Sequence, residues 1–335
     1  GAVLIGFQAG YSCTWNYTVA IGHNALVSQT SGNYNLGIGK DAIGANQTGA
    51  RNTAVGYQAL KTTTANENTA IGFAAGKEQT TGGENTFVGS YCGANGAITG
   101  NGNTGIGRFT LFALTGGSFN TALGHQSGIG ITTGESNTLV GKNSGVDIGT
   151  GSRNSVLGRS AGTKITSGSD NVAIGYDALN NQVSNGQTVA IGVNALYTYT
   201  GTRTVAIGYG AAQDLVGDVD NVFIGQQAGA NRTTGIDNTF VGAYANYNGV
   251  ATGCCNTGFG KATGYSLTSG VQNTFVGRQA GYSVASADNN TIVGHNAGIY
   301  GTGAGNTIMG SGAGGKFGMT GTNHTIMGLT AGDEI

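Results

Sequence analysis

The chain has 335 residues, 66 of them glycine and none proline, with 9% charged residues and a net charge of −1. This balance excludes the basic patch of a nucleic-acid-binding protein and a polybasic membrane-binding segment. No apolar run is long enough to span a membrane, and the four cysteines lack metal-ligand spacing, so we expect no membrane insertion, no metal and no cofactor.

One short sequence motif recurs along the whole chain, and residues 273–281, NTFVGRQAG, are a clear copy of it. Its first glycine, here the anchor glycine at position 0, occurs twenty times from Gly6 to Gly328, with a nearly constant interval of about 17 residues. Regular spacing of this kind is typical of stacked repeats. Composition does not shift and no linker interrupts the period, so we expect a single elongated repeat domain over 1–335. We also expect this domain to be a segment of a longer fibre protein.

Each copy predicts a short strand at positions −4 to −1, beginning with residues 2–5, 18–21 and 35–38 and ending with residues 324–327. Position −1 is apolar in all twenty copies, and position −3 is Thr or Val in eighteen. A two-residue offset places both positions on one face of a strand. We interpret position −1 as the buried core column, with position −3 pointing inward beside it. Representative members of the predicted core column are Val55, Ile71, Val140, Ile174 and Val276.

Position −4 is Asn in fifteen copies, and the residue before it is often acidic. Asparagine bonds neighbouring backbone in turns, and one asparagine per coil can form a ladder. We predict a structural asparagine ladder rather than a ligand site, with members that include Asn52, Asn85, Asn137, Asn238 and Asn273.

The other regular positions indicate corners. Position +3 is Ala in fifteen copies, position +4 is mostly Gly or Leu, and position −7 is Gly in fourteen. Two interpretations of the small residues at +3 and +4 stay open: a flat strip against which another copy packs, or a sharp corner inside one chain.

A coil of about 17 residues cannot bury its own surface, whereas coils stacked at about 4.8 Å can cover each other. The predicted fold is therefore all-β, a β-solenoid or β-roll of about 20 rungs. A helical repeat fails because its units need about 30 residues. A triangular hexapeptide helix stays a minor alternative, since it needs an apolar column every six residues.

Copies such as TVAIGVNAL (188–196), NVAIGYDAL (171–179) and NTAVGYQAL (52–60) resemble the head repeats of trimeric autotransporter adhesins. They resemble even more the NTAIG-type repeats in the shafts of bacteriophage tail fibres. This resemblance covers nearly the whole chain, although the repeats of autotransporter heads are shorter. It implies a homotrimeric rod, on a virion or extracellular, that binds or presents rather than catalyses.

Position +1 is the variable outer position and is where contacts with a cell-surface glycan or protein receptor would lie. Aromatic and basic side chains there can stack on sugars or hold acidic polymers, although an outer face that only keeps the rod soluble has the same pattern. The candidate surface-contact residues are Tyr57, Arg108, Lys142, Arg159, Tyr176, Tyr209, Lys261 and Arg278.

Other chemistry has little support in the sequence. Asp214, Asp218 and Asp220 surround one turn, but the GGxGxD signature of calcium-binding rolls is absent. The acidic residues are spread over many coils, unlike the paired carboxylates of a polysaccharide depolymerase. Ice binding by a threonine ladder is disfavoured because the Thr column is expected to point inward.

The sequence thus predicts a non-enzymatic fibre segment, of the phage tail-fibre or receptor-binding shaft type. The alternative is a bacterial or archaeal cell-surface adhesin or extracellular filament subunit.

Overall fold

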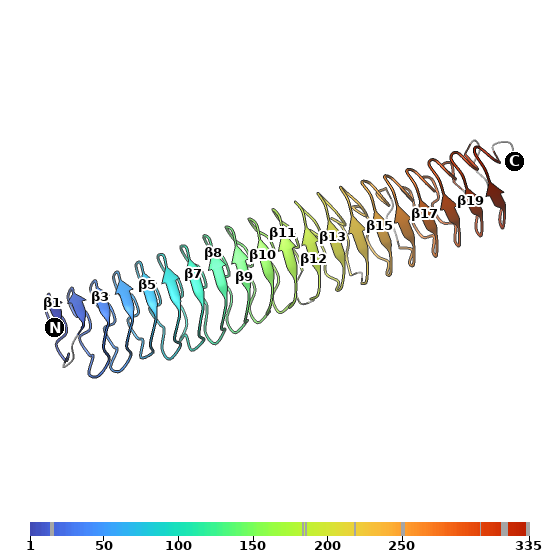
Figure 1. Ribbon diagram of the computed structural model, residues 1–335. Coiled ribbons are helices and arrows are strands. Elements are labelled where there is room, and N and C mark those ends of the chain that lie inside the picture. The colour runs from blue at the N-terminus through green and yellow to red at the C-terminus, as the bar shows by residue number, and fades with distance from the viewer. Residues whose placement is uncertain are drawn as a thin grey trace. The chain divides into compact units, whose positions relative to one another are not determined.

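The computed structural model describes residues 1–13, 17–182, 184, 186–217, 219–248, 252–301, 303–315 and 321–332. Within these ranges every regular element is a short β-strand, so no helix is present that is long and apolar enough to cross a membrane. The chain divides into two compact units, Gly1–Asp170 and Asn171–Ile335, each of which is described by itself. Figure 1 draws the strands of both units as arrows, coloured in chain order.

Both units are stacks of coils with one three-residue strand in each coil. In the described part of unit 1 these are β1 (Val3–Ile5), β2 (Val19–Ile21), β3 (Leu36–Ile38), β4 (Thr53–Val55), β5 (Thr69–Ile71), β6 (Thr86–Val88), β7 (Thr104–Ile106), β8 (Thr121–Leu123), β9 (Thr138–Val140) and β10 (Ser155–Leu157). In unit 2 they are β11 (Val172–Ile174), β12 (Val189–Ile191), β13 (Val205–Ile207), β14 (Val222–Ile224), β15 (Thr239–Val241), β16 (Thr257–Phe259), β17 (Thr274–Val276), β18 (Thr291–Val293), β19 (Thr307–Met309) and β20 (Thr325–Met327).

Successive strands of a unit pair in parallel, and like positions of the repeat face one another. In the β4–β5 pair, for example, Thr53 lies beside Thr69, Ala54 beside Ala70 and Val55 beside Ile71. Hydrogen bonds between coils continue through the turns: Gly72 N donates to Val55 O at 2.8 Å and Leu60 N to Ala75 O at 3.0 Å. The predicted β-solenoid, with one strand in each repeat of the sequence, is confirmed.

The prediction that position −1 forms the core is wrong. Phe275 at position −2 is fully buried, whereas its neighbour Val276 at −1 is 38% exposed. Ile71 is 42% exposed, and the three other named members of the column (Val55, Val140, Ile174) are half-buried. Side chains alternate between the two faces of a strand, so an error of one position reverses the whole assignment. Position −3 lies on the same outward face as −1, as expected from the offset, and therefore also points out.

The true core column at −2 varies in sequence, and the space beside it is filled from position +4 or from adjacent coils. In some coils −2 is Ala and +4 is Leu, as in Ala54 and Leu60, and both are fully buried. In others −2 is Phe and +4 is Gly, and a Cβ on Gly281 would lie 2.6 Å from the Phe275 ring. Where both positions are small, as in Ala70 and Gly76, side chains of adjacent coils keep the packing dense, since a Cβ on Gly76 would lie 2.8 Å from Leu60. Neither position is constant enough to reveal the core from the sequence.

Two further columns complete the interior. Position +3 is fully buried in Ala59, Cys92 and Ser127, so the small residues there fit a corner inside the chain. Their interpretation as a packing strip for another copy is wrong. Position +7 is a further buried column, which the sequence analysis did not predict. It is polar in some coils and apolar in others. Its members include Gln29, Asn46, Thr63, Gln79, Leu114, Ile131, Ile148, Ile165, Gln182, Tyr199, Leu215, Arg232, Leu267 and Val284.

The asparagines at position −4 lie buried beside the strands and bond to one another from coil to coil. Asn137 Nδ2 donates to Asn120 Oδ1 at 3.0 Å and to Gly151 O at 2.9 Å, and Asn154 N and Nδ2 donate to Asn137 Oδ1. Asn52, Asn85, Asn238 and Asn273 take part in the same pattern. Each amide therefore satisfies buried backbone groups that would otherwise cost about 1–3 kcal/mol each.

Candidate functional site

The outward face of the strands is the most distinctive surface of both units. We call it the sheet face and define it by positions −3 and −1 of β1 to β20. Its side chains are Thr, Val, Leu or Ser at −3 and Ile, Val, Leu, Met or Phe at −1, so it carries no charged residue. Ile106, Leu157, Phe259 and Met309 on it are 39–48% exposed. An uncharged and largely aliphatic surface of this kind in each unit is typical of an interaction site.

The Thr column at position −3 therefore points to solvent. The expectation that it points inward, which disfavoured ice binding, is wrong. Threonine occupies position −3 in six consecutive strands, β4 to β9, and again in β15 to β20. Neighbouring strands lie about 4.8 Å apart, and residues −3 and −1 are about 6.6 Å apart along a strand. Hydroxyl and methyl groups are thus displayed in a regular two-dimensional array.

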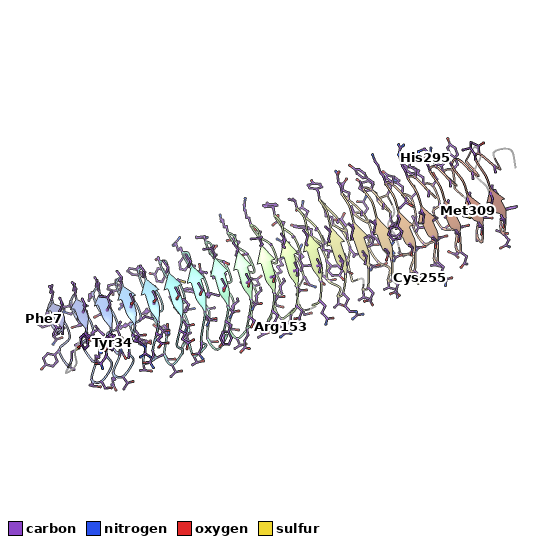
Figure 2. All side chains as sticks on the ribbon, viewed as in Figure 1. Phe7, Tyr34, Arg153, Cys255, His295 and Met309 are labelled. Atoms are coloured by element: carbon purple, nitrogen blue, oxygen red, sulfur yellow. The ribbon has the colours of Figure 1, made fainter. Side chains whose placement is uncertain are left out.

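Two edges border the sheet face. In unit 2, His295 at position +1 projects beyond one end of the strands, and Cys255 at position −5 beyond the other, with Met309 on the face (Figure 2). All eight candidate surface-contact residues lie at position +1 and are exposed: Tyr57, Arg108, Lys142, Arg159, Tyr176, Tyr209, Lys261 and Arg278. The fold spaces them along the two units and does not gather them into one site.

Aromatic rings on the +1 edge stack mainly on each other. The rings of Tyr57 and Phe73, both at position +1, have centroids 5.0 Å apart, and those of Tyr91 and Phe109, at the adjacent position +2, have centroids 5.3 Å apart. Lys40 Nζ lies 5.9 Å from the Tyr57 ring centroid. Contacts between neighbouring coils therefore use part of the Tyr57 ring area that a ligand would need.

Ion pairs occupy the −5 edge. Arg51 pairs with Glu67, Arg153 with Asp170 and Arg203 with Asp220, all with exposed side chains. Hydrogen bonding to Arg203 lowers the pKa of the Asp220 carboxyl. Exposed pairs contribute little stability. Of the three aspartates considered for an ion, Asp220 is thus paired and Asp218 lies outside the described residues.

Among the described residues, no cluster of side chains indicates metal binding or thiol chemistry. No group of three or more His, Cys, Asp or Glu side chains there could hold a metal ion. Burial raises the pKa of the Cys92 thiol to about 12, which keeps it protonated and unreactive. Cys254 and Cys255 are free thiols whose Sγ atoms lie 2.9 Å apart, and their hydrogen bond raises the pKa of Cys255.

Two grooves open on the surface outside the sheet face. One of about 390 Å³ lies in unit 1 along the −5 edge and is lined by polar corner residues that include the Arg51–Glu67 pair. The other, of about 260 Å³, lies in unit 2 and is lined by Tyr176, Asp177, Asn194, Tyr197 and Gln213. Only Tyr176 was singled out in the sequence. The other four residues are at positions +2 and +5 of neighbouring coils, and aligning the coils by their anchor glycines would have placed them together.

Neither protein-family models nor curated proteins give a match to this chain.

Proposed function

We propose that the chain is a non-enzymatic fibre segment, of the phage tail-fibre or receptor-binding shaft type, whose copies pack together through the sheet face. The observation that supports this proposal is the uncharged, largely aliphatic surface that the strands of each unit present. Such a face is not tolerated in water over a large area unless something covers it.

The area of the sheet face in each unit is a substantial part of what a stable interface needs. Ten strands at about 4.8 Å and three residues of about 3.3 Å give a face of about 480 Å² for each unit. A standard interface buries about 800 Å² on each partner. The face of one unit alone offers more than half of this standard.

A second copy of the chain fits this face better than an unrelated partner does. Another copy has the same spacing between coils, so its rows of side chains match those of each unit. The face also changes along the chain, with Val-x-Ile in β11 to β14 and bulky Phe259 and Met309 further on. When copies associate in register around a symmetry axis, each irregular residue meets its own equivalent. Three copies are proposed from the resemblance to trimeric fibres, with a virion or extracellular location.

Ile71→Asp tests this proposal. The side chain is 42% exposed, so a carboxylate there stays hydrated in the separate chain, whereas in the oligomer it would be buried without a partner. We expect native mass measurements to show an oligomer, a trimer of about 100 kDa, for the natural chain of 33.3 kDa. The variant should be a monomer with an unchanged circular dichroism spectrum.

Asn95→Asp is the matched control because Asn95 is exposed in the same unit and lies off the sheet face. This variant should keep the oligomeric mass. A monomeric natural chain at micromolar concentration would contradict the proposal.

A cell-surface adhesin or extracellular filament subunit would use the same packing and differ only in how it is attached. Flanking modules of the full-length protein distinguish the two: a tail-attachment module indicates a phage fibre, and a secretion anchor indicates an adhesin.

Ice binding is a second candidate because the Thr array of β4 to β9 lies outward. It predicts that the monomeric chain lowers the freezing point of a solution below its melting point. Thr104→Tyr, in the middle of that array, should abolish the effect by lifting the surface off the ice. The two functions need the same face, so a stable oligomer without freezing-point depression excludes this candidate.

A further inference from the structure

We propose that the groove lined by Tyr176, Asp177, Asn194, Tyr197 and Gln213 binds one ring of a neutral saccharide. This inference rests on the proposed function, since it names the class of surface molecule that the fibre contacts. It depends on the geometry of three successive coils in unit 2, those that contain β11, β12 and β13.

The backbone fixes the lining residues in place. Asn194 N donates to Tyr176 O at 3.0 Å, Asn181 N to Tyr197 O at 3.2 Å and Thr198 N to Gln213 O at 3.1 Å. Residues from three coils are therefore held by the same hydrogen bonds that stack the solenoid. A site built on such a rigid support loses little entropy when a ligand binds.

The polar side chains of the groove keep unused hydrogen-bonding capacity. Asp177 Oδ1 accepts from Asn180 Nδ2 at 3.1 Å, which leaves Asp177 Oδ2 open. Among the described residues, no protein group bonds the side-chain amides of Asn194 and Gln213 or the Tyr197 hydroxyl. Elsewhere at position +2 neighbouring coils can pair, as Asn24 does with Asp41 at 3.2 Å. This groove instead gathers both donors and acceptors, which is what hydroxyl groups require.

The Tyr197 ring is also available. Other tyrosines at position +5 cover one another: Tyr247 and Tyr265 have ring centroids 5.5 Å apart, and Tyr265 and Tyr282 have centroids 4.6 Å apart. Tyr197 has no ring contact with any described residue. A half-buried phenol with a free face can pack against the C–H face of a pyranose while polar neighbours bind the hydroxyls at its edge.

Charge and size narrow the ligand class. Asp177 is the only charged residue among the described ones that line the groove, so phosphate, sulfate and carboxylate ligands are repelled. A volume of about 260 Å³ lies below the range of about 300–1,000 Å³ for sites that hold larger molecules, which suits a single ring. We expect a Kd of about 1 mM for one site, with a higher effective affinity when several copies of the chain present it together.

The test is a calorimetric and saturation-transfer NMR titration of the 335-residue chain with the methyl glycosides of glucose, galactose, mannose and N-acetylglucosamine. At least one should saturate below about 20 mM. Tyr197→Ala should weaken its binding at least tenfold. Asp177→Asn, which keeps the shape and tolerates the φ of 53° at this position, should weaken it about fivefold or more.

Tyr300→Ala is the matched control because Tyr300 is an exposed tyrosine of the same unit outside the groove, and it should bind as the natural chain does. Circular dichroism checks that each variant is folded. If Tyr197→Ala does not fold, the binding of Asp177→Asn decides the test. Failure of every glycoside to saturate, or equal losses in Tyr197→Ala and Tyr300→Ala, would overturn the inference. Saccharide binding by a monomeric chain would support this saccharide site and refute only the proposed fibre function.

Discussion

Gly72→Ala should destabilise unit 1 by about 2–6 kcal/mol, the sum of about 1–3 kcal/mol of backbone strain and about 1–3 kcal/mol of overpacking. Gly72 is an anchor glycine with φ of +136°, and a Cβ there would lie 2.7 Å from the carbonyl carbon of Gly89 in the next coil. The two coils would have to separate at that point, which would break hydrogen bonds that continue through the stack.

Gly149→Ala is the matched control in the same unit. Its Cβ would lie at an ordinary 3.6 Å from Thr166 O, and its φ is not in the left-handed region. We expect its stability to stay within about 1 kcal/mol of the natural chain. Thermal unfolding followed by circular dichroism measures both, and a fall in Tm of about 10 °C is expected for Gly72→Ala alone. Equal melting temperatures for the two variants would show that the anchor glycines are not required by close contact between coils.

Phe275→Asp and Val276→Asp should differ strongly although they are adjacent in the chain. Phe275 is fully buried, and its ring fills the space above Gly281, so a carboxylate there loses its hydration and leaves a cavity. Removing the ring alone costs about 3–5 kcal/mol, and the charge adds to this loss. We expect the coils around β17 to unfold.

Val276 is 38% exposed on the sheet face, so an aspartate there stays in water. In dilute solution, where copies are separate, Val276→Asp should change the free energy of unfolding by less than about 1 kcal/mol. Limited proteolysis and thermal unfolding distinguish the two variants. Greater loss in Val276→Asp than in Phe275→Asp under these conditions would restore position −1 as the core.

The sequence by itself determined the coil length, the place of the strands and the register between them. Anchor glycines that recur at nearly constant spacing allow only a short repeat unit, and Val-x-Ile or Thr-x-Val before each anchor favours a strand. The asparagine at −4 was also predictable, because a residue that bonds both its own turn and the next coil has few substitutes.

Only the tertiary structure decided which side of each strand is buried. An invariant apolar column such as that of Ile71 and Val276 indicates the core in most proteins, but here the core positions −2 and +4 vary from coil to coil, as in Phe275 with Gly281 and Ala54 with Leu60. Dense packing depends on both positions and on the adjacent coils at once, and no single column reveals it. The groove around Tyr197 depends in the same way on contacts between coils: its residues come from three coils, and their arrangement follows from stacking rather than from any local motif.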